Sequence, residues 1–451
     1  MYRKDLLGEA KDEILKYISS IDVDREFTGE VIQSLIAHVK TLVAQGYIEK
    51  ELGNKILSEL NSLLKDPSPL FNIKAEDVHE AIEIYLKSKF GDDEGYIALG
   101  KSRNDHVSSA LRLWIKKSII KEIHELINLR EVLVKKAEQY LDSVFILCTH
   151  LQSSQVSTFA HYLTYIEETL AIYTDLLFLA LKFVDKSPLG SGAICSTMVH
   201  LDREALGKEA GFKDIIFNSI AATSNRDFIA IAGSINTCLS TFLSRIAEDI
   251  VILSTPQFNY IKLPATHLST SSIMPHKKNP VTMEIARAWA AESIGHIVSI
   301  LGILKGLPSG YNLDLQEANK HIIVIFKRTL ETIKIFKDLF VNIEVNTESV
   351  LRDLNNYPVL ATEIAEKICM VMGLPYRKVH SEIASIIRES KSIEDFYTRI
   401  KEKYDIEVSV NDCLRKPNLG SPNPEIIGKY IDSAKKKLSS DKSKLELISK
   451  A

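Results

Sequence analysis

Residues 228–253 constrain the fold of this chain more than any other stretch, because they are apolar on nearly every side of a helix. Apolar residues recur at three- and four-residue intervals from Phe228 through Leu239 to Leu253, which is the spacing of one helical stripe. The opposite side carries a second apolar set: Ile229, Ile231, Cys238, Leu243 and Ile250. We expect a helix buried nearly all round, and a bundle completed by further copies of the chain supplies that burial more readily than a monomer does.

Long helical patterns of this kind dominate residues 107–340, where turn-forming residues are scarce. The 451 residues include only 19 Gly and 13 Pro, and this favours long helices. Shorter amphipathic helices are expected after about residue 350, with Gly373 and Pro375 marking a helix–turn–helix. The charged last stretch, residues 433–451, is expected to be a solvated or frayed helix. The sequence shows neither βαβ alternation nor a phosphate-binding glycine motif, so a nucleotide-binding sheet is not expected.

The bulk chemistry of the chain argues against several classes of protein. A formal charge of −3 gives no global bias toward nucleic acid or an anionic membrane. The N-terminal segment lacks the apolar core of a signal peptide, and Arg245, Glu248 and Asp249 break the longest apolar run, so we expect no membrane span. Five scattered cysteines without a CxxC pair fit a reducing compartment. We therefore predict a cytoplasmic protein that binds neither nucleic acid nor membrane.

Several polar segments interrupt the helical patterns, and we place them at the ends of bundle helices. Taken singly, each is typical of a helix cap or a solvated turn. Together they offer cationic, amide and hydroxyl groups suited to a small substrate with several carboxylates. These groups belong to Arg103, Asn104, Thr149, His150, Gln152, Arg226, Lys277, Asn279, Tyr311 and Gln316. No histidine pair has helical ligand spacing with an acidic partner, so no metal site is expected.

The order and spacing of these segments resemble those of a known family. SSIMPHKKNP is similar to the signature loop of the fumarase/aspartase superfamily, whose members eliminate fumarate from a succinyl group. SRNDHV, THLQSSQ, SPLGSGA, SNRDF and YNLDLQE follow the order found in the argininosuccinate lyase family. The resemblance spans nearly the whole chain, from SSIDVDRE to LGSPNPE. Within the superfamily, the resemblance to the argininosuccinate lyase family depends mainly on SRND and YNLDLQE, which adenylosuccinate lyases and fumarases do not share.

This resemblance implies an all-α, three-domain fold of the fumarase/aspartase type, with a long central helical bundle completed by tetramerisation. We expect an N-terminal helical domain over residues 1–103, the central bundle over residues 104–350, and a small helical domain over residues 351–451. The resemblance also implies a homotetramer whose active sites are each shared between three subunits. In it, the SRND, THLQ and SSIMPHKKNP segments of one site come from different chains. No cofactor is expected.

The implied reaction is the reversible β-elimination of fumarate from argininosuccinate to give arginine, a step of arginine biosynthesis. The proton removed lies next to a carboxylate and is weakly acidic, so the site must stabilise a doubly negative intermediate. By position in the family motifs, Ser271 matches the base, carried on a mobile lid, and Lys277 and Asn279 match groups that stabilise the charge. His150 matches the histidine that protonates the leaving nitrogen, directly or through water, and Glu284 the carboxylate that orients it.

Further positions match substrate-binding residues of the family. They are Ser20, Arg103, Asn104, Thr149, Asn279, Tyr311 and Gln316, with a weaker match at Arg226, and Gln152 and Lys320 complete the predicted binding set. The chain departs from the family pattern at Thr270, where a glycine is usual, and at Asn319, where the binding lysine is expected one residue before Lys320. Ala98, Leu99 and Lys101 also replace a usual His-Thr-Gly-Arg run, and the N-terminal RGGR-like segment is not recognisable. These departures concern affinity more than elimination.

Two rival interpretations stay open at this point. MPHK, with His276, is also typical of adenylosuccinate lyase or another fumarate-releasing enzyme, although nothing in the sequence demands a purine-nucleotide pocket. A purely structural role, as in the crystallins of this family, would not need the catalytic set. That set is complete here: Ser271, His150, Glu284, Lys277 and Asn279.

Overall fold

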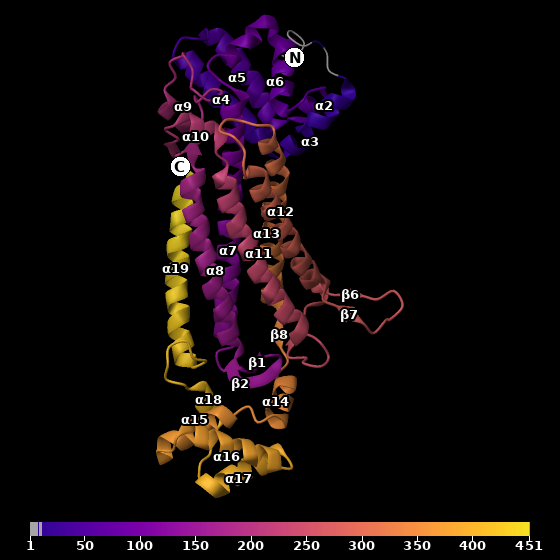
Figure 1. Cartoon of the computed structure of the whole chain (residues 1–451), viewed down its shortest axis with the longest axis vertical. Coiled ribbons are helices and arrows are strands. Elements are labelled where there is room, and N and C mark those ends of the chain that lie inside the picture. The colour runs from indigo at the N-terminus through magenta and orange to yellow at the C-terminus, as the bar shows by residue number, and fades with distance from the viewer. Residues whose placement is uncertain (1–7, 9–10, 451) are drawn as a thin grey trace.

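The computed structural model describes residues 8 and 11–450, and nearly all of its regular structure is helical (Figure 1). A cap of short helices, a bundle of long helices and a small group of helices follow one another along its longest axis. The all-α class predicted from the sequence is confirmed.

The cap holds the first helices of the chain around a hydrophobic core of its own, which includes Phe27, Ile32, Leu42 and Leu60. Its helices are α2 (Asp12–Ile18), α3 (Ile21–Asp24), α4 (Thr28–Ala44), α5 (Lys50–Lys65) and α6 (Val78–Phe90). Three 3-10 turns join them: η1 (Arg25–Phe27), η2 (Ser68–Asn72) and η3 (Gly91–Ala98). Together these elements close the end of the bundle at which the first long helix begins.

Five long helices form the bundle: α7 (Arg103–Gln139), α8 (Phe159–Val184), α11 (Asp227–Leu253), α12 (Val281–Leu304) and α13 (Asp314–Asn342). The longest, α7, starts at a capping box, in which Ser102 accepts from the Asn104 N–H and Asp105 accepts from the Ser102 N–H. Its 37 residues span about 55 Å at ~1.5 Å per residue. This length separates the two ends of the molecule.

Helix α11 contains residues 228–253, the stretch predicted to be a helix buried nearly all round. The chain buries most of the predicted stripe, although Leu253 at its end is only partly buried, and it also buries Ile229, Leu243 and Ile250. On the remaining side, Ile231 is 38% exposed and Cys238 is exposed. Within one chain the helix is therefore buried on most, but not all, of its surface.

Helix α11 is also the one helix of the described residues that is long and apolar enough to cross a membrane, by length and composition alone. More than half of its most apolar window, 56%, is buried inside the chain, and buried core helices meet the same criterion. The burial of α11 thus fits the bundle helix predicted from its periodicity, and length and composition alone do not make it a membrane span.

Neighbouring bundle helices expose apolar side chains along their outer faces. They include Ile172, Leu179 and Phe183 on α8, and Ile285, Ile294, Val298 and Leu301 on α12. Single exposed apolar residues are ordinary, but sets that follow whole helices mark a contact surface. We call these residues, together with Ile231 of α11, the outer apolar faces.

Short elements connect the long helices at both ends. Near the cap lie α9 (Arg203–Glu209), α10 (Ser219–Ser224) and the parallel pair β3 (Lys186–Ser187) and β4 (Asp214–Ile215). At the opposite end, β1 (Val144–Thr149) and β2 (Gln152–Thr158) form an antiparallel hairpin, and β5 (Ile261–Lys262) pairs with β8 (Glu344–Val345). The strands β6 (Ser269–Thr270) and β7 (Lys278–Asn279) pair at the base of a loop that projects from the bundle (Figure 1).

The last helices are α14 (Thr347–Asn356), α15 (Ala361–Met372), α16 (Tyr376–Glu389), α17 (Ile393–Tyr404), α18 (Val410–Leu414) and α19 (Pro424–Lys450). Gly373 ends α15 in the left-handed conformation and Pro375 precedes α16, so the predicted helix–turn–helix is confirmed. The last stretch is a helix with mostly exposed side chains, as predicted, but it is neither frayed nor solvated on every side. Helix α19 runs back along α7 and α8 (Figure 1) and buries Leu438, Asp441 and Leu445, which a solvated tail would not do.

A buried ionic network fastens α19 to the bundle. Arg130 of α7 is fully buried and donates to Glu167 of α8 at 2.9 Å and to Asp441 of α19 at 2.8 Å. Tyr430, also on α19, donates to the second Glu167 oxygen. The last helix thus supplies one of the two carboxylates that face the buried guanidinium of Arg130.

We expect Asp441→Asn to lower the free energy of unfolding by about 3 kcal/mol, because it removes one of the two carboxylates that compensate the buried guanidinium. Asp175→Asn is the matched control: this exposed carboxylate of α8 pairs with Lys437 of the same last helix, and its loss should cost less than about 1 kcal/mol. Denaturant unfolding at fixed protein concentration measures both. Equal effects of the two substitutions would contradict the account of the network.

Candidate active site

The residues that the sequence predicts for the site lie in two groups at opposite ends of the bundle. Arg103 begins α7 and Thr149 ends the strand that follows it, so about 55 Å of helix separates the first two segments. The cap-end group comprises Ser20, Arg103, Asn104, Arg226, Tyr311, Gln316 and Lys320. The far-end group comprises Thr149, His150, Gln152, Ser271, Lys277, Asn279 and Glu284. A single chain does not bring the two groups together.

Five of the cap-end residues line one cavity, which we call the cap-end cavity. They are Ser20, Arg103, Asn104, Tyr311 and Gln316. Ser20 precedes α3, and Arg103 and Asn104 begin α7. Tyr311 lies in the loop before α13, and Gln316 in the first turn of that helix. The helix starts of three distant segments therefore meet at this point.

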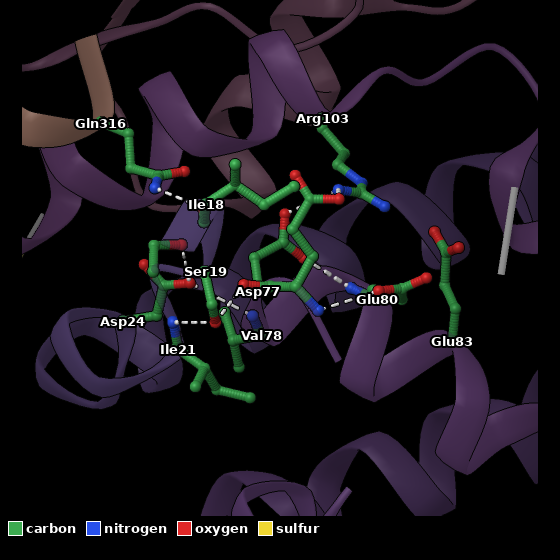
Figure 2. Close-up of polar contacts among 12 residues, drawn as sticks. Ile18, Ser19, Ile21, Asp24, Asp77, Val78, Glu80, Glu83, Arg103 and Gln316 are labelled. Carbon is green, nitrogen blue, oxygen red and sulfur yellow. Dashed lines mark hydrogen bonds and ion pairs between the residues drawn. The ribbon is translucent and has the colours of Figure 1, made fainter. Parts of the chain in front are cut away.

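Carboxylates orient the arginine in this cavity. Asp77 caps α6 by accepting from the Glu80 N–H at 2.8 Å, and its second oxygen accepts from Arg103 Nη1 at 2.9 Å (Figure 2). A Glu76 oxygen lies 3.7 Å from the same nitrogen. Burial raises the pKa of Glu76, against the opposing effect of Arg103. The guanidinium is thus held against two neighbouring acidic side chains.

Asp24 adds a third carboxyl group to the cavity. It accepts from Ser20 Oγ at 2.8 Å and from the Val78 N–H at 3.2 Å (Figure 2). Burial raises the pKa of Asp24 to about 7, outweighing the two hydrogen bonds. The cavity thus holds three acidic side chains beside one arginine, and Glu76 and Asp77 give it the carboxylates that suit a cationic part of a ligand, since Asp24 is partly protonated at neutral pH.

The raised pKa predicts a pH-dependent stability. Between the ordinary value of 3.8 and about 7, the folded chain holds a proton on Asp24 that the unfolded chain has released. This contribution to stability is present at low pH and is lost as the pH rises through 7. Because asparagine does not titrate, we expect Asp24→Asn to gain stability relative to the wild type between pH 5 and pH 8.

Melting temperatures of the wild type and Asp24→Asn at the two pH values measure this gain. Asp22→Asn is the control, because Asp22 stands on the same short helix and its side chain is 91% exposed. A difference between Asp24→Asn and wild type that stays the same at pH 5 and pH 8 would contradict the assignment.

Arg226 and Lys320 lie near the cap-end cavity without lining it. Arg226 is buried, donates to the backbone carbonyls of Thr223 and Asn225, and lies close enough to Tyr311 to influence its ionisation. Burial lowers the pKa of Arg226 to about 10, so it stays cationic at neutral pH. Lys320 is exposed and pairs with Glu317.

The departures from the family pattern have local explanations. Asn319, at the position of the usual lysine, is buried and lines the cap-end cavity. Lys101 turns toward Glu83 in a nearly buried ion pair of 2.8 Å, and the Leu99 carbonyl contacts His38 Nε2 at 3.0 Å. Thr270 lies in strand β6 and has no positive φ, so a threonine occupies the position of the usual glycine without backbone strain.

The SPLGSGA segment lies against the start of α7. The Asp105 carboxylate accepts from the Gly192 N–H at 2.9 Å, and Asn104 donates to the Ala193 carbonyl at 3.0 Å. Gly192 has a φ of +58°, and an added β-carbon there would lie 2.5 Å from the Ser196 carbonyl oxygen. The glycine is therefore required for this loop to reach the SRND segment.

The sequence predicted that His150 and its neighbours Thr149 and Gln152 lie at the end of a helix. This prediction is wrong, because His150 lies in a β-turn between two strands. The pairing of Thr149 with Gln152 leaves His150 and Leu151 as a two-residue turn, with φ values of 55° and 59°. Such a turn prefers asparagine and glycine, and a leucine there is strained. The strained turn presents an exposed histidine at the tip of the hairpin.

The projecting loop, residues 269–279, carries Ser271 near its base and Lys277 near its other end; we call it the lid. Ser271 Oγ accepts from the N–H groups of Ile273 and Met274 at 3.4 and 3.2 Å. Lys277 is exposed, as is Glu284 in the first turn of α12. Within residues 11–450, the side chains of His150, Lys277 and Glu284 make neither a hydrogen bond nor an ion pair. In one chain, His150 and Glu284 therefore do not pair.

Some residues of the site were missed by the sequence analysis. They are Asp24, Glu76, Asp77, His79 and Asn319 of the cap-end cavity. An acidic residue before a helix is typical of a cap, and Asp77 is one; only its ion pair with Arg103 also makes it part of the site. Among the described residues, no group of three histidine, cysteine or acidic side chains could hold a metal ion.

Comparison with known proteins assigns the chain to a family. A family model described as lyase matches residues 9–295. The chain is 53% identical to the argininosuccinate lyase of Pyrococcus furiosus over 446 residues, which is 99% of this chain and 97% of that protein.

Solved structures of low sequence identity share the fold. An EDDS lyase in complex with formate superimposes with a TM-score of 0.85 at 24% identity, covering 98% of this chain and 93% of that one. A class II fumarase from Schistosoma mansoni gives a TM-score of 0.72 at 17% identity, covering 85% and 90%. By the family model and the 53% identity to the Pyrococcus furiosus protein, the chain belongs to the lyase family and, within it, to the argininosuccinate lyases.

Proposed function

We propose that this protein is an argininosuccinate lyase that eliminates fumarate from argininosuccinate and releases arginine. The observation that carries the proposal is the chemical division of the site: an acidic cavity at the cap end and a serine on a cationic lid at the far end. The relative from Pyrococcus furiosus, which bears the same activity in its name, supports this reading.

The two halves of the site match the two halves of argininosuccinate. Asp24, Glu76 and Asp77 suit the guanidinium and ammonium groups of the arginine half, which are cations. Lys277 and Asn279 on the lid suit the two carboxylates of the succinate half, where negative charge grows during elimination. The substrate would thus lie between a cap end and a lid.

Ser271 is proposed as the base that removes the proton next to the succinate carboxylate. A serine does this only as an alkoxide, which needs stabilisation. The two backbone N–H groups directed at Ser271 Oγ favour the charged form, because hydrogen bonds to an anion lower the pKa of its acid. Closure of the lid would exclude water and add the charge of Lys277.

His150 is proposed to deliver the proton that the leaving guanidino nitrogen needs. Its ring is exposed at the tip of the β1–β2 hairpin and is free within the described chain, so it can reach a substrate held by another copy. Glu284 would orient and charge this histidine. In this proposal His150 supplies the proton to the leaving nitrogen, directly or through a water molecule.

We propose that the protein assembles as a homotetramer with each site shared between three subunits. Two lines of argument support sharing. The predicted site residues of one chain lie about 55 Å apart, so antiparallel copies are needed to place a cap end beside a far end. The outer apolar faces of α8, α11 and α12 offer the surface for that contact.

The five free cysteines fit a cytoplasmic setting.

The activity is tested by following the absorbance of fumarate released from argininosuccinate and from adenylosuccinate. We expect release from argininosuccinate alone, with no dependence on added metal or cofactor. Release from adenylosuccinate but not argininosuccinate would assign the chain to the rival branch. Release from neither substrate would favour a structural role.

A further inference from the structure

One buried histidine joins the two ends of the lid. His267 lies two residues before β6 and Thr282 three residues after β7, so they flank the lid on either side. His267 Nδ1 lies 2.9 Å from Thr282 Oγ1, and Nε2 lies 2.9 Å from the Asp338 carboxylate on α13. The histidine is only 2% exposed.

The chemistry of the three groups fixes the direction of these hydrogen bonds. A carboxylate only accepts, so His267 Nε2–H donates to Asp338. In the neutral ring Nδ1 then accepts, and the Thr282 hydroxyl donates to it. The hydrogen bonds therefore run from Thr282, at one foot of the lid, to the ring of His267, at the other foot. From that ring they continue to Asp338 on the bundle helix α13.

We propose that His267, Thr282 and Asp338 form a clamp that positions Ser271 by fixing both feet of the lid to α12 and α13. His267 is a positioning residue in this account, because it acts on the substrate only through the serine four residues further along. The inference rests on the proposed function, in which Ser271 is the base.

Apart from the first turn of α12, on which Thr282 stands beside the buried Met283, only a short ladder holds the base of the lid within the described chain. The β6–β7 ladder contains only two residue pairs, and the loop beyond it is exposed from Ser272 to Lys278. Four extended residues reach about 13 Å, so a small rotation at His267 displaces Ser271 by ångströms. A displacement of about 1 Å at a reacting group costs up to roughly 100-fold in rate.

The clamp also explains how a lid can move without losing its register. Joining the two feet closes a loop of fixed length, which leaves motion to the exposed residues between them. Asp338 stands on a long bundle helix, so the fixed point belongs to the most rigid part of the chain.

Thr282→Val is the sharpest test, because it keeps the shape of the side chain and removes only the hydroxyl that joins the feet. Thr332→Val is the matched control. Thr332 lies on α13 beside the same small apolar cavity as Thr282, and its hydroxyl donates to the Arg328 carbonyl at 2.8 Å, away from the lid. Asp338→Ala removes the anchor to the bundle, and His267→Phe removes both bonds.

Two readouts are needed. The first is the kcat and KM for fumarate release, where we expect Thr282→Val and Asp338→Ala to lower kcat by about tenfold or more with a smaller change in KM. The second is the rate at which a protease cuts residues 272–278 of the folded enzyme, which should rise several-fold. Melting temperature and both readouts should stay near wild type in Thr332→Val.

The outcomes separate the clamp from the proposed function. Suppose that the protease cuts Thr282→Val and Asp338→Ala no faster than wild type and that both variants release fumarate as fast as wild type. The clamp then does not position the lid. If the wild type releases no fumarate, the proposed function fails, while the cleavage rates still decide whether the clamp holds the lid. Should His267→Phe melt early, the two milder variants decide the matter.

Discussion

Replacing Ser271 by alanine is expected to lower turnover by roughly 10²–10⁴-fold, the range of a lost general base, while folding and substrate affinity stay near wild type. The serine hydroxyl is proposed to act only when the proton leaves, so its loss raises the barrier without weakening ground-state binding. Its Oγ accepts two backbone hydrogen bonds at the base of the lid, which alanine forfeits at little cost, since the loop is exposed.

The measurement is kcat and KM for fumarate release by the purified variant. Ser272→Ala is the matched control, because Ser272 is the adjacent, exposed serine of the same lid and has no hydrogen bond to Ile273 or Met274. It should keep turnover within about threefold of wild type, the scale of one modest hydrogen bond. A loss below about tenfold in Ser271→Ala, or equal losses in both variants, would remove Ser271 from the role of base.

The helical framework could be read from the sequence because its signals are local. Residues 228–253 form α11 as their periodicity predicted, and Gly373 ends its helix as a C-cap glycine should. The β1–β2 hairpin was missed because its turn residues, His150 and Leu151, are not those that two-residue turns prefer. A strained turn at a functional site is where local rules are expected to fail.

Long-range contacts set the second limit. The charged last stretch has the composition of a solvated helix, and most of its side chains are exposed. One face is buried nevertheless, because Leu438 and Leu445 pack on the bundle and Asp441 pairs with Arg130, 311 positions earlier in the chain. Asp24 and Asp77 similarly become part of a site only because the fold brings α3, α6 and α7 together at one cavity. Periodicity carries no information about such pairings.

In the candidate site, too, motifs predict some features and only the fold shows the others. The resemblance supplied candidate residues, and five of the seven cap-end candidates do line one cavity. The separation of those residues from the lid by the length of α7 follows from the fold and not from motif order. That separation is the physical reason to expect sites built from several chains.

The largest gain of activity is expected from mixing two inactive variants. Ser271→Ala damages the lid and His150→Asn damages the hairpin, and each variant leaves the other segment intact. In the lower part of Figure 1 the lid of one chain projects away from its own β1–β2 hairpin. If hairpin and lid at one site come from different chains, some sites of a mixed tetramer receive both intact segments.

Random assembly of an equal mixture gives about a quarter of the sites an intact hairpin and an intact lid, since each is supplied with a probability of about one half. The two variants are unfolded together, refolded, and assayed for fumarate release. A mixture of Ser271→Ala with Lys277→Met is the control: both changes lie on the lid, so no site gains an intact lid and no serine-dependent activity should return.

The fraction of wild-type activity recovered by the refolded Ser271→Ala and His150→Asn mixture tests the shared site most directly. The account predicts about a quarter of wild-type activity in the mixture, with almost none in either variant refolded alone. No recovery, with mixed tetramers verified by mass, would mean that each site takes its hairpin and lid from one chain.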